Sequence, residues 1–99
     1  MRYLFLLNPT AGKRDCTAEL APAIQAAAQR AGIPPEKRKV VVTQYAGHAR
    51  ELAAEAAHTA QADGEPVRIW TAGGDGTFNE ALTGAQGCSL AAVGCLPFG

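Results

Sequence analysis

A strand, a glycine-rich turn and the start of a helix follow one another in residues 67–80, VRIWTAGGDGTFNE. Val67–Thr71 contains Val, Ile, Trp and Thr, which are enriched in strands. Gly73–Gly76 places three glycines in four positions, and glycine permits tight turns with positive φ. Thr77 and Glu80 then have the spacing of a capping box, S/T-x-x-E, so we expect a short helix to begin there.

The same alternation of strand and helix extends toward both ends of the chain. Three more apolar or β-branched segments predict strands, at residues 3–7, 39–43 and 90–95. Two longer segments repeat apolar residues every three to four positions and predict helices, at residues 17–31 and 47–63. Glycines supply stop signals for the three helices, at Gly32, Gly64 and Gly84. The pattern predicts an α/β fold, a Rossmann-like three-layer α/β/α arrangement of about four parallel strands and three helices with right-handed crossovers.

The composition argues against several classes of protein. Ninety-nine residues are the length of a single domain, and no linker divides the chain. Nine Lys and Arg residues balance nine Asp and Glu residues, which argues against a nucleic-acid binder because such proteins neutralise phosphates with clustered cations. Hydrophobic residues make up 47% of the chain, which is typical of a folded globular protein. A membrane-spanning helix needs about 20 predominantly apolar residues, and no such stretch is present.

Two features bear on the compartment. The apolar run Tyr3–Leu7 stops at Asn8 and is shorter than the apolar core of a signal peptide, which has roughly 7–15 residues. The three cysteines, Cys16, Cys88 and Cys95, are an odd number without paired spacing, which suits buried thiols in a reducing compartment. We therefore expect a cytoplasmic protein.

Four loops are expected to meet at one edge of the sheet. Ligands of open parallel sheets bind beyond the carboxyl ends of the strands. The segments that follow the four predicted strands are residues 8–15, 44–48, 73–76 and 96–99, and three of them are rich in Gly, Pro or short polar residues. This convergence is the main indication of a binding site.

The loop Gly73–Gly76 has two interpretations. Its glycines remove the Cβ atoms that would keep a bulky anion away from the backbone, and its N–H groups lie at a helix N-terminus, where the helix dipole favours negative charge. A phosphate would then bind without a basic side chain, and Asp75 would accept a hydrogen bond from a ribose hydroxyl or a metal-bound water. The alternative is a tight turn in which Asp75 merely caps the helix.

The other loops carry weaker indications. Asn8, at a strand end, would hold a neighbouring loop through its amide, and Lys13 or Arg14 would contact a polyphosphate; a solvated turn with two surface cations is the alternative. Thr43 offers a hydroxyl at the sheet edge, whereas His48 and His58 are expected on the surface. Neither the P-loop nor the dinucleotide-binding fingerprint matches, and no His/Cys spacing typical of a metal site is present.

Four motifs occur in order along the chain: Asn8-Pro9-x-x-Gly12, Thr43 followed by Gly47-His48-Ala49, Gly73-Gly74-Asp75-Gly76-Thr77-x-Asn79-Glu80, and Leu96-Pro97-x-Gly99. Together they resemble the diacylglycerol kinase catalytic domain family, which includes bacterial lipid kinases and sphingosine kinases. The resemblance covers essentially the whole chain. NAD kinases and phosphofructokinases also contain such glycine loops, but the Asn-Pro turn and the Gly-His-Ala helix start favour the lipid kinases.

The resemblance implies ATP-dependent transfer of the γ-phosphoryl group to a lipid hydroxyl, with Mg²⁺ as cofactor. ATP and a diacylglycerol-like or sphingoid-like acceptor are the implied partners, and contact with a membrane surface would be transient. The resemblance also implies nucleotide contacts by a set of loop residues: Asn8, Pro9, Gly12, Lys13, Thr43, Gly73, Gly74, Asp75, Gly76, Thr77, Asn79, Glu80 and Gly99.

One departure from the family limits the expected activity. In family members the Leu-Pro-x-Gly motif continues into a Thr-x-Asn-Asp segment and a second, β-rich domain that carries the acceptor pocket and the catalytic base. Residues 1–99 therefore resemble the N-terminal nucleotide-binding part, and we expect them to bind ATP weakly and to transfer nothing. An NAD kinase-like domain and a non-enzymatic nucleotide-binding fragment are the alternatives.

Overall fold

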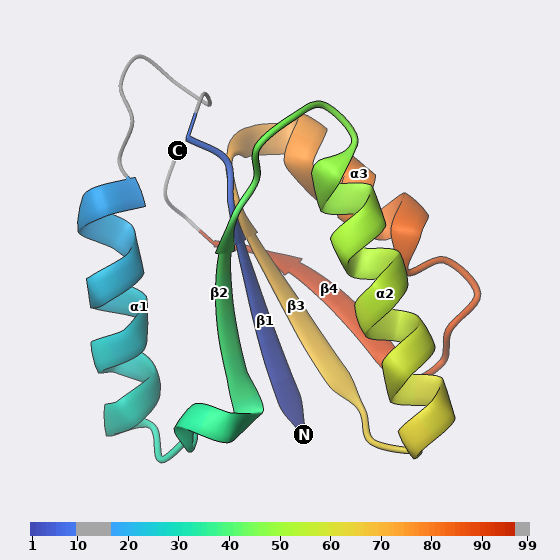
Figure 1. Ribbon diagram of the computed structural model, residues 1–99, viewed down its shortest axis with the longest axis horizontal. Helices are drawn as coiled ribbons and strands as arrows, with labels where there is room; N and C mark the ends of the chain where they lie inside the picture. Colours follow the sequence, from blue (N-terminus) through green and yellow to red (C-terminus); the bar gives the residue numbers. More distant parts are fainter. Residues whose placement is uncertain (10–16, 97–99) are drawn as a thin grey trace.

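A computed structural model describes residues 1–9 and 17–96, with strands and helices in the predicted order (Figure 1). The four strands are β1 (Arg2–Leu7), β2 (Arg38–Val42), β3 (Val67–Ala72) and β4 (Ala91–Cys95). The α-helices are α1 (Thr17–Arg30), α2 (His48–Asp63) and α3 (Gly74–Gly84), and a short 3₁₀ helix (Pro35–Lys37) precedes β2. The ends of these elements lie within one residue of the predicted ones, except at the start of α3. Within the described ranges, no helix is both long enough and apolar enough to cross a membrane.

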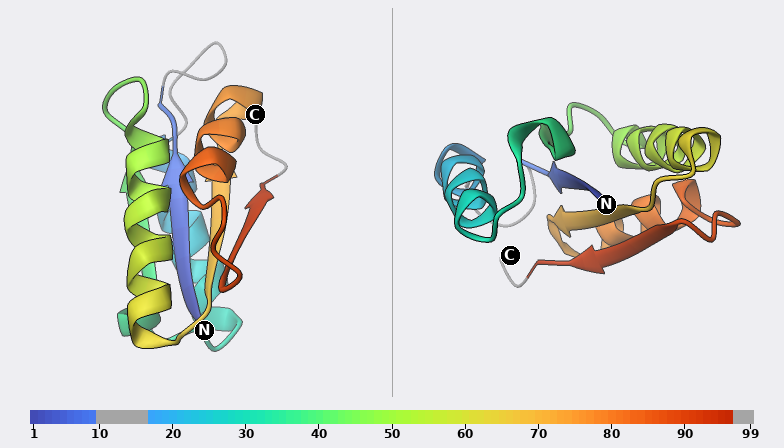
Figure 2. Two further views of the ribbon diagram at one scale, coloured as in Figure 1. Left: turned by 90° about the vertical axis from the view of Figure 1, so that its right-hand side faces the viewer. Right: turned by 90° about the horizontal axis from the view of Figure 1, so that it is seen from below.

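The sheet is entirely parallel, with the strand order β2-β1-β3-β4. Helix α1 lies on one face of the sheet, whereas α2 and α3 cover the other (Figure 2). Right-handed crossovers require this placement, because the step from β1 to β2 runs along the sheet in the direction opposite to the two later steps. The predicted three-layer α/β/α arrangement is thus confirmed.

Successive side chains of β1 point to opposite faces of the sheet. Leu4 and Leu6 pack under α2 and α3, whereas Phe5 and Leu7 pack toward Ile24 of α1. On the side of α2 and α3 the buried apolar residues of the two helices are all alanines, Ala49, Ala53, Ala57, Ala60 and Ala81, and Ala85 directly after α3 is buried with them. Because alanine is small, both helices lie close to the strands, which places the first turn of α3 near the end of β1.

Gly84 allows α2 and α3 to approach each other closely. A Cβ atom at this position would lie 2.2 Å from the carbonyl oxygen of Arg50 and 3.0 Å from the backbone nitrogen of Ala54, both in α2. Gly84 is also the last residue of α3, so the predicted helix end is confirmed. The close approach to α2 is a second role that helix periodicity does not indicate.

The expectation of buried thiols is wrong. Cys95 is exposed and Cys88 is half-buried, because Cys95 lies at the end of the edge strand β4 and Cys88 in the loop before it; Cys16 lies outside the described residues. Helix α1 contains a proline, Pro22, well inside its length. A proline at this depth removes a hydrogen bond of the helix rather than replacing a free terminal N–H.

The chain leaves the neighbouring strands β1 and β3 toward opposite faces of the sheet. From β1 it proceeds to α1 on one face, and from β3 it enters α3 on the other (Figure 1). In open α/β sheets such a topological switch point forms a crevice beyond the carboxyl ends of the strands, where ligands bind. Asn8 follows β1 and Gly73 follows β3, so these two residues border the crevice.

Candidate functional site

A hollow of about 590 Å³ opens at the carboxyl edge of the sheet, within the range of small-molecule sites. Its walls come from the end of β1, the loop between β2 and α2, and α3. The lining residues are Asn8, Pro9, Val42, Thr43, Gln44, Tyr45, Ala46, Ala49, Thr77 and Glu80. Five of the predicted site residues, from three distant parts of the sequence, therefore surround one hollow: Asn8, Pro9, Thr43, Thr77 and Glu80.

Asn8 joins the end of β1 to α3. Its backbone nitrogen donates to the carbonyl oxygen of Ala72 at 2.9 Å, and its side-chain Nδ2 donates to Oγ1 of Thr77 at 3.0 Å. Thr77 is buried and Asn8 is half-buried. The side-chain amide of Asn8 thus holds a neighbouring segment, as the sequence predicts. This hydrogen bond fixes the first turns of α3 against the end of β1.

The turn between β3 and α3 requires glycine at two positions. Gly73 has a φ of +156° and Gly74 a φ of +84°. A Cβ atom on Gly73 would also lie 2.5 Å from Cβ of Asn8 and 2.8 Å from Oγ1 of Thr77. Gly76 does not have a positive φ and lies in the helix. Two of the three glycines in this turn, rather than all three, therefore adopt a positive φ that other residues rarely adopt.

The predicted capping box at Thr77 and Glu80 is wrong. Helix α3 begins at Gly74, and its N-cap residue is Gly73, which makes no side-chain cap. Thr77 lies within the helix, where its Oγ1 donates to the carbonyl oxygen of Gly73 at 3.4 Å and accepts from Asn8. Two successive glycines with positive φ allow the chain to pass directly from strand to helix, so no side-chain cap is needed further along.

The first turn of α3 presents backbone donors at the crevice. The first N–H groups of an α-helix have no intrahelical partner, and the N-cap Gly73 has no side chain to satisfy one. Gly74, Asp75 and Gly76 are all exposed. The helix dipole adds partial positive charge at the same place. This arrangement can bind an anionic group through main-chain donors alone.

Thr43 lies directly after β2, at the sheet edge where the sequence predicts it. Its backbone nitrogen donates to the carbonyl oxygen of Leu7 at 2.8 Å, and its hydroxyl donates to the same oxygen at 3.3 Å. The residue is 7% exposed. Thr43 therefore holds the end of β2 against the end of β1, and its oxygen remains able to accept a hydrogen bond within the hollow.

Among the described residues, residues 73–76 and Asn79 were also predicted to contact the nucleotide but do not line this hollow. Asn79 is exposed and lines a separate hollow of about 600 Å³ between α3 and β4. Thr77 and Glu80 share one face of α3 because they are three residues apart, whereas Asn79 points away from that face. Asp75 is exposed on the first turn. Three predicted nucleotide contacts lie outside the described residues: Gly12, Lys13 and Gly99.

The carboxylates near the crevice bear on the implied Mg²⁺. Within residues 1–9 and 17–96, no group of three His, Cys, Asp or Glu side chains gathers to form a metal site. Mg²⁺ is usually held by one or two carboxylates together with substrate phosphates and waters. Asp75, beside the free N–H groups, and Glu80, in the hollow, fit this pattern better than a dedicated protein site.

Tyr45 was not singled out from the sequence, yet it lines the hollow. At 56%, Tyr45 has the highest exposure of the large hydrophobic residues that the structure describes. The signal in the sequence is an aromatic residue in a short loop between a strand and a helix that begins after Gly47.

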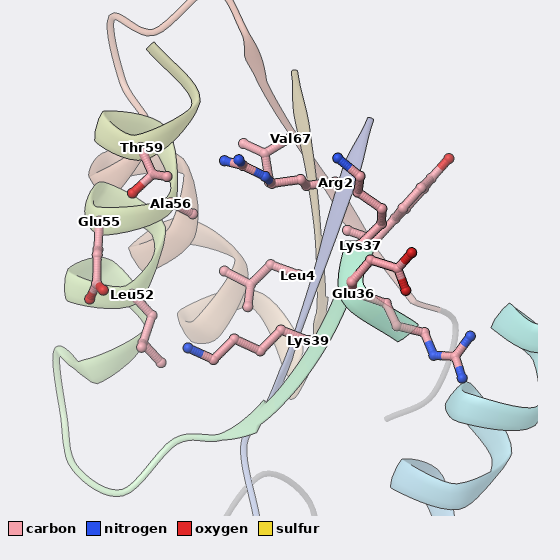
Figure 3. A pocket seen from close by; sticks show the side chains of 12 residues that line it. Arg2, Leu4, Glu36, Lys37, Lys39, Leu52, Glu55, Ala56, Thr59 and Val67 are labelled. Carbon is pink, nitrogen blue, oxygen red and sulfur yellow. The ribbon is translucent and has the colours of Figure 1, made fainter. Parts of the chain in front are cut away.

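A second hollow, of about 280 Å³, lies at the opposite edge of the sheet, between β2 and α2 (Figure 3). Its basic residues favour an anion: Arg2, Lys37, Arg38 and Lys39. Glu36 and Glu55 line the same hollow, however, and reduce its positive charge. It also lies at the amino ends of the strands, away from the edge where ligands of parallel sheets bind. It is therefore the weaker candidate.

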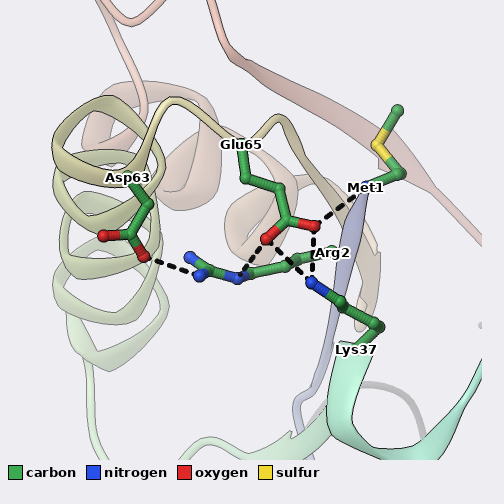
Figure 4. Close-up of polar contacts among 5 residues, drawn as sticks. All are labelled: Met1, Arg2, Lys37, Asp63 and Glu65. Carbon is green, nitrogen blue, oxygen red and sulfur yellow. Dashed lines mark hydrogen bonds and ion pairs between the residues drawn. The ribbon is translucent and has the colours of Figure 1, made fainter.

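Two of these cations are already paired with carboxylates (Figure 4). Glu65 lies 2.8 Å from Nζ of Lys37, 3.0 Å from Nε of Arg2 and 3.1 Å from the amino group of Met1. Arg2 also pairs with Asp63 at 2.6 Å. The network joins the segment between α2 and β3 to the start of β1, and it leaves less positive charge for a ligand.

The same network predicts how stability depends on pH. The hydrogen bond from Lys37, followed by that from the N-terminal amino group, lowers the pKa of Glu65 from 4.5 to about 2. A lowered folded-state pKa means that the stabilisation is complete above pH 4.5 and is lost as the pH falls toward 2. We expect the melting temperature of the wild type to fall more steeply across this range than that of Glu65→Gln. Lys37→Met should flatten the wild-type dependence in the same way, and equal slopes for all three proteins would contradict the assignment.

The model of the family described as diacylglycerol kinase catalytic domain matches residues 2–99. A search among curated proteins finds no match. The matched region includes β1, β2, β3 and the three segments that surround the carboxyl-edge hollow. The chain therefore belongs to the diacylglycerol kinase catalytic domain family, a family of lipid kinases.

Proposed function

We propose that this chain is the nucleotide-binding part of an ATP-dependent lipid kinase, and that the ATP phosphates lie against the first turn of α3. Kinases of this family use ATP. In the reaction of such a kinase, the γ-phosphoryl group passes from ATP to a hydroxyl of the lipid. Phosphoryl transfer depends mainly on positioning and on neutralising charge, which backbone donors and a metal ion can provide.

The observation that carries the proposal is the junction of Asn8, Gly73 and Thr77. Gly73 has no room for a Cβ atom between the other two side chains, so the start of α3 lies directly against the end of β1. Gly74, Asp75 and Gly76, three exposed residues whose N–H groups begin α3, therefore lie at the topological switch point, where phosphates bind in many open α/β sheets.

The residues of the crevice have distinct proposed roles. The amides of the first turn would bind phosphate oxygens, and the oxygens of Thr43 and Glu80 would orient the nucleotide inside the hollow. Asp75 would hold Mg²⁺, which when bound neutralises charge on the phosphates. Pro9 restricts the backbone after Asn8 and so keeps this wall of the hollow in place.

The family match also bears on the alternatives. It favours a lipid kinase over an NAD kinase-like domain, because the diacylglycerol kinase model covers residues 2–99. A non-enzymatic nucleotide-binding domain would keep the same crevice, and it differs only in what happens after ATP has bound. The lipid acceptor is proposed from the family, since the described residues include no feature that selects one lipid.

A calorimetric titration of the 99-residue chain tests the proposal. We expect Mg-ATP and Mg-tripolyphosphate each to bind weakly and to compete, because both place phosphates on the amides of α3. Binding of ATP without competition from tripolyphosphate would contradict a phosphate site in the crevice. Absence of binding by both ligands would overturn the proposed function as a whole.

A further inference from the structure

An exposed aromatic ring stands at the rim of the carboxyl-edge hollow. Tyr45, in the loop between β2 and α2, is 56% exposed and lines the hollow together with Thr43, Thr77 and Glu80. Covering an aromatic face that is exposed to water is favourable, because apolar surface is removed from water. Tyr45 lies beside the polar groups of this hollow at the carboxyl edge of the sheet, so its ring is placed to contact a ligand there.

The ring of Tyr45 is held in place before any ligand binds. It stacks on the imidazole of His48, with 4.5 Å between ring centroids and 16° between ring planes. Its hydroxyl donates to the carboxylate of Glu51. The imidazole is itself fixed, since its Nδ1 accepts from the backbone nitrogen of Gln44 at 3.0 Å. One face of the tyrosine ring packs on His48, so its exposure comes from the other face and the edges.

The hydroxyl of Tyr45 stays protonated under ordinary conditions. Its hydrogen bond to Glu51 raises the pKa of Tyr45 above its usual value. The ring therefore remains neutral beside a polyanionic ligand. A rigid, neutral and flat apolar surface is suited to stacking on a planar heteroaromatic ring, and aromatic groups prefer such offset-stacked arrangements.

We propose that Tyr45 stacks on the nucleobase of the bound nucleotide, at the end of the hollow away from the phosphates. The proposal rests on the proposed function, because it takes the phosphate end of the ligand to lie at α3. Thr77, three residues after the start of α3, and Tyr45 line the same hollow, so a ligand within it would contact both this helix and the ring. Tyr45 is then a residue that contributes to the choice of nucleotide over a bare polyphosphate.

Two variants and two ligands test the proposal. Tyr45→Leu keeps an apolar side chain but removes the flat ring, whereas Tyr45→Phe keeps the ring and its stack on His48. Mg-ATP and Mg-tripolyphosphate are titrated into the 99-residue chain, and binding is followed through backbone amide signals. We expect Tyr45→Leu to weaken ATP binding about tenfold, as is typical for loss of one stacked base, and to leave tripolyphosphate binding unchanged. Tyr45→Phe should retain most of the ATP affinity.

The outcomes separate this inference from the proposed function. Equal weakening of both ligands by Tyr45→Leu, or unchanged ATP affinity, would overturn the stacking role while leaving the phosphate site intact. An equal loss of ATP affinity in Tyr45→Phe and Tyr45→Leu would show that the hydroxyl, not the ring, matters, and would also overturn it. If the wild type binds neither ligand, the proposed function fails and the stacking role fails with it.

Discussion

Replacing Gly73 with alanine is expected to abolish detectable ATP binding and to destabilise the domain by about 2–5 kcal/mol. Backbone strain at a positive φ contributes about 1–2 kcal/mol, and overpacking contributes about 1–3 kcal/mol. The new Cβ would lie 2.5 Å from Cβ of Asn8 and 2.8 Å from Oγ1 of Thr77. Either the hydrogen bond between these two side chains breaks or α3 moves away from β1. Both changes displace the N–H groups that are proposed to bind phosphate.

Gly74→Ala is the matched control for this effect. Gly74 also has a positive φ, +84°, but a Cβ there would meet nothing within 4 Å. The substitution should therefore add only the strain of about 1–2 kcal/mol and preserve the fold. Its Cβ would still crowd a phosphate, so ATP binding should weaken without the larger loss of stability. Chemical denaturation and ATP titration of both variants measure the two effects, and full ATP affinity in folded Gly73→Ala would contradict the proposed phosphate position.

Replacing Gly84 with alanine is expected to destabilise the fold by about 1–3 kcal/mol or more, without a direct effect on the crevice. At an ordinary position inside a helix the same substitution has the opposite effect, because alanine stabilises the helix by about 1 kcal/mol relative to glycine. The new Cβ would lie 2.2 Å from a backbone oxygen of α2, and a backbone atom cannot rotate away as a flexible side chain can. Helices α2 and α3 would have to separate, which exposes the alanines between them.

Gly76→Ala provides the comparison within the same helix. Gly76 has no positive φ, and a Cβ there would meet nothing within 4 Å. Its replacement should leave the free energy of unfolding unchanged or raise it slightly, because alanine favours the helix. Urea denaturation of Gly84→Ala and Gly76→Ala gives the difference directly. Equal stability of the two variants would show that α2 and α3 do not touch at Gly84.

Much of the fold could be predicted from local patterns. Alternating strand and helix segments indicate a parallel sheet, whereas the face on which each helix lies follows from the handedness of crossovers only together with the strand order β2-β1-β3-β4. The convergence of loops at one edge needs no strand order, since parallel strands all end there. For this reason the sequence places Asn8 and Thr43, which are far apart along the chain, at one edge of the sheet, where both line the same hollow.

The errors arise where tertiary contacts decide the local structure. Thr77 and Glu80 have the spacing of a capping box, but the positive φ values of Gly73 and Gly74 start the helix earlier. The close approach at Gly84 depends on the distance between two helices, which a single helical pattern does not report. The sequence does not indicate a role for Tyr45, because the orientation of its ring depends on His48 and Glu51, which contact it only in the folded protein.

The most direct test of the phosphate site is an amide-resolved NMR titration of the 99-residue chain with Mg-ATP. We expect the largest changes at the backbone amides of Gly74, Asp75 and Gly76, with smaller changes around Thr43. The proposed phosphate site would be contradicted if these amides remained unchanged while the signals of Lys37 and other residues of the basic hollow moved, since that result would place the phosphates at the opposite edge of the sheet.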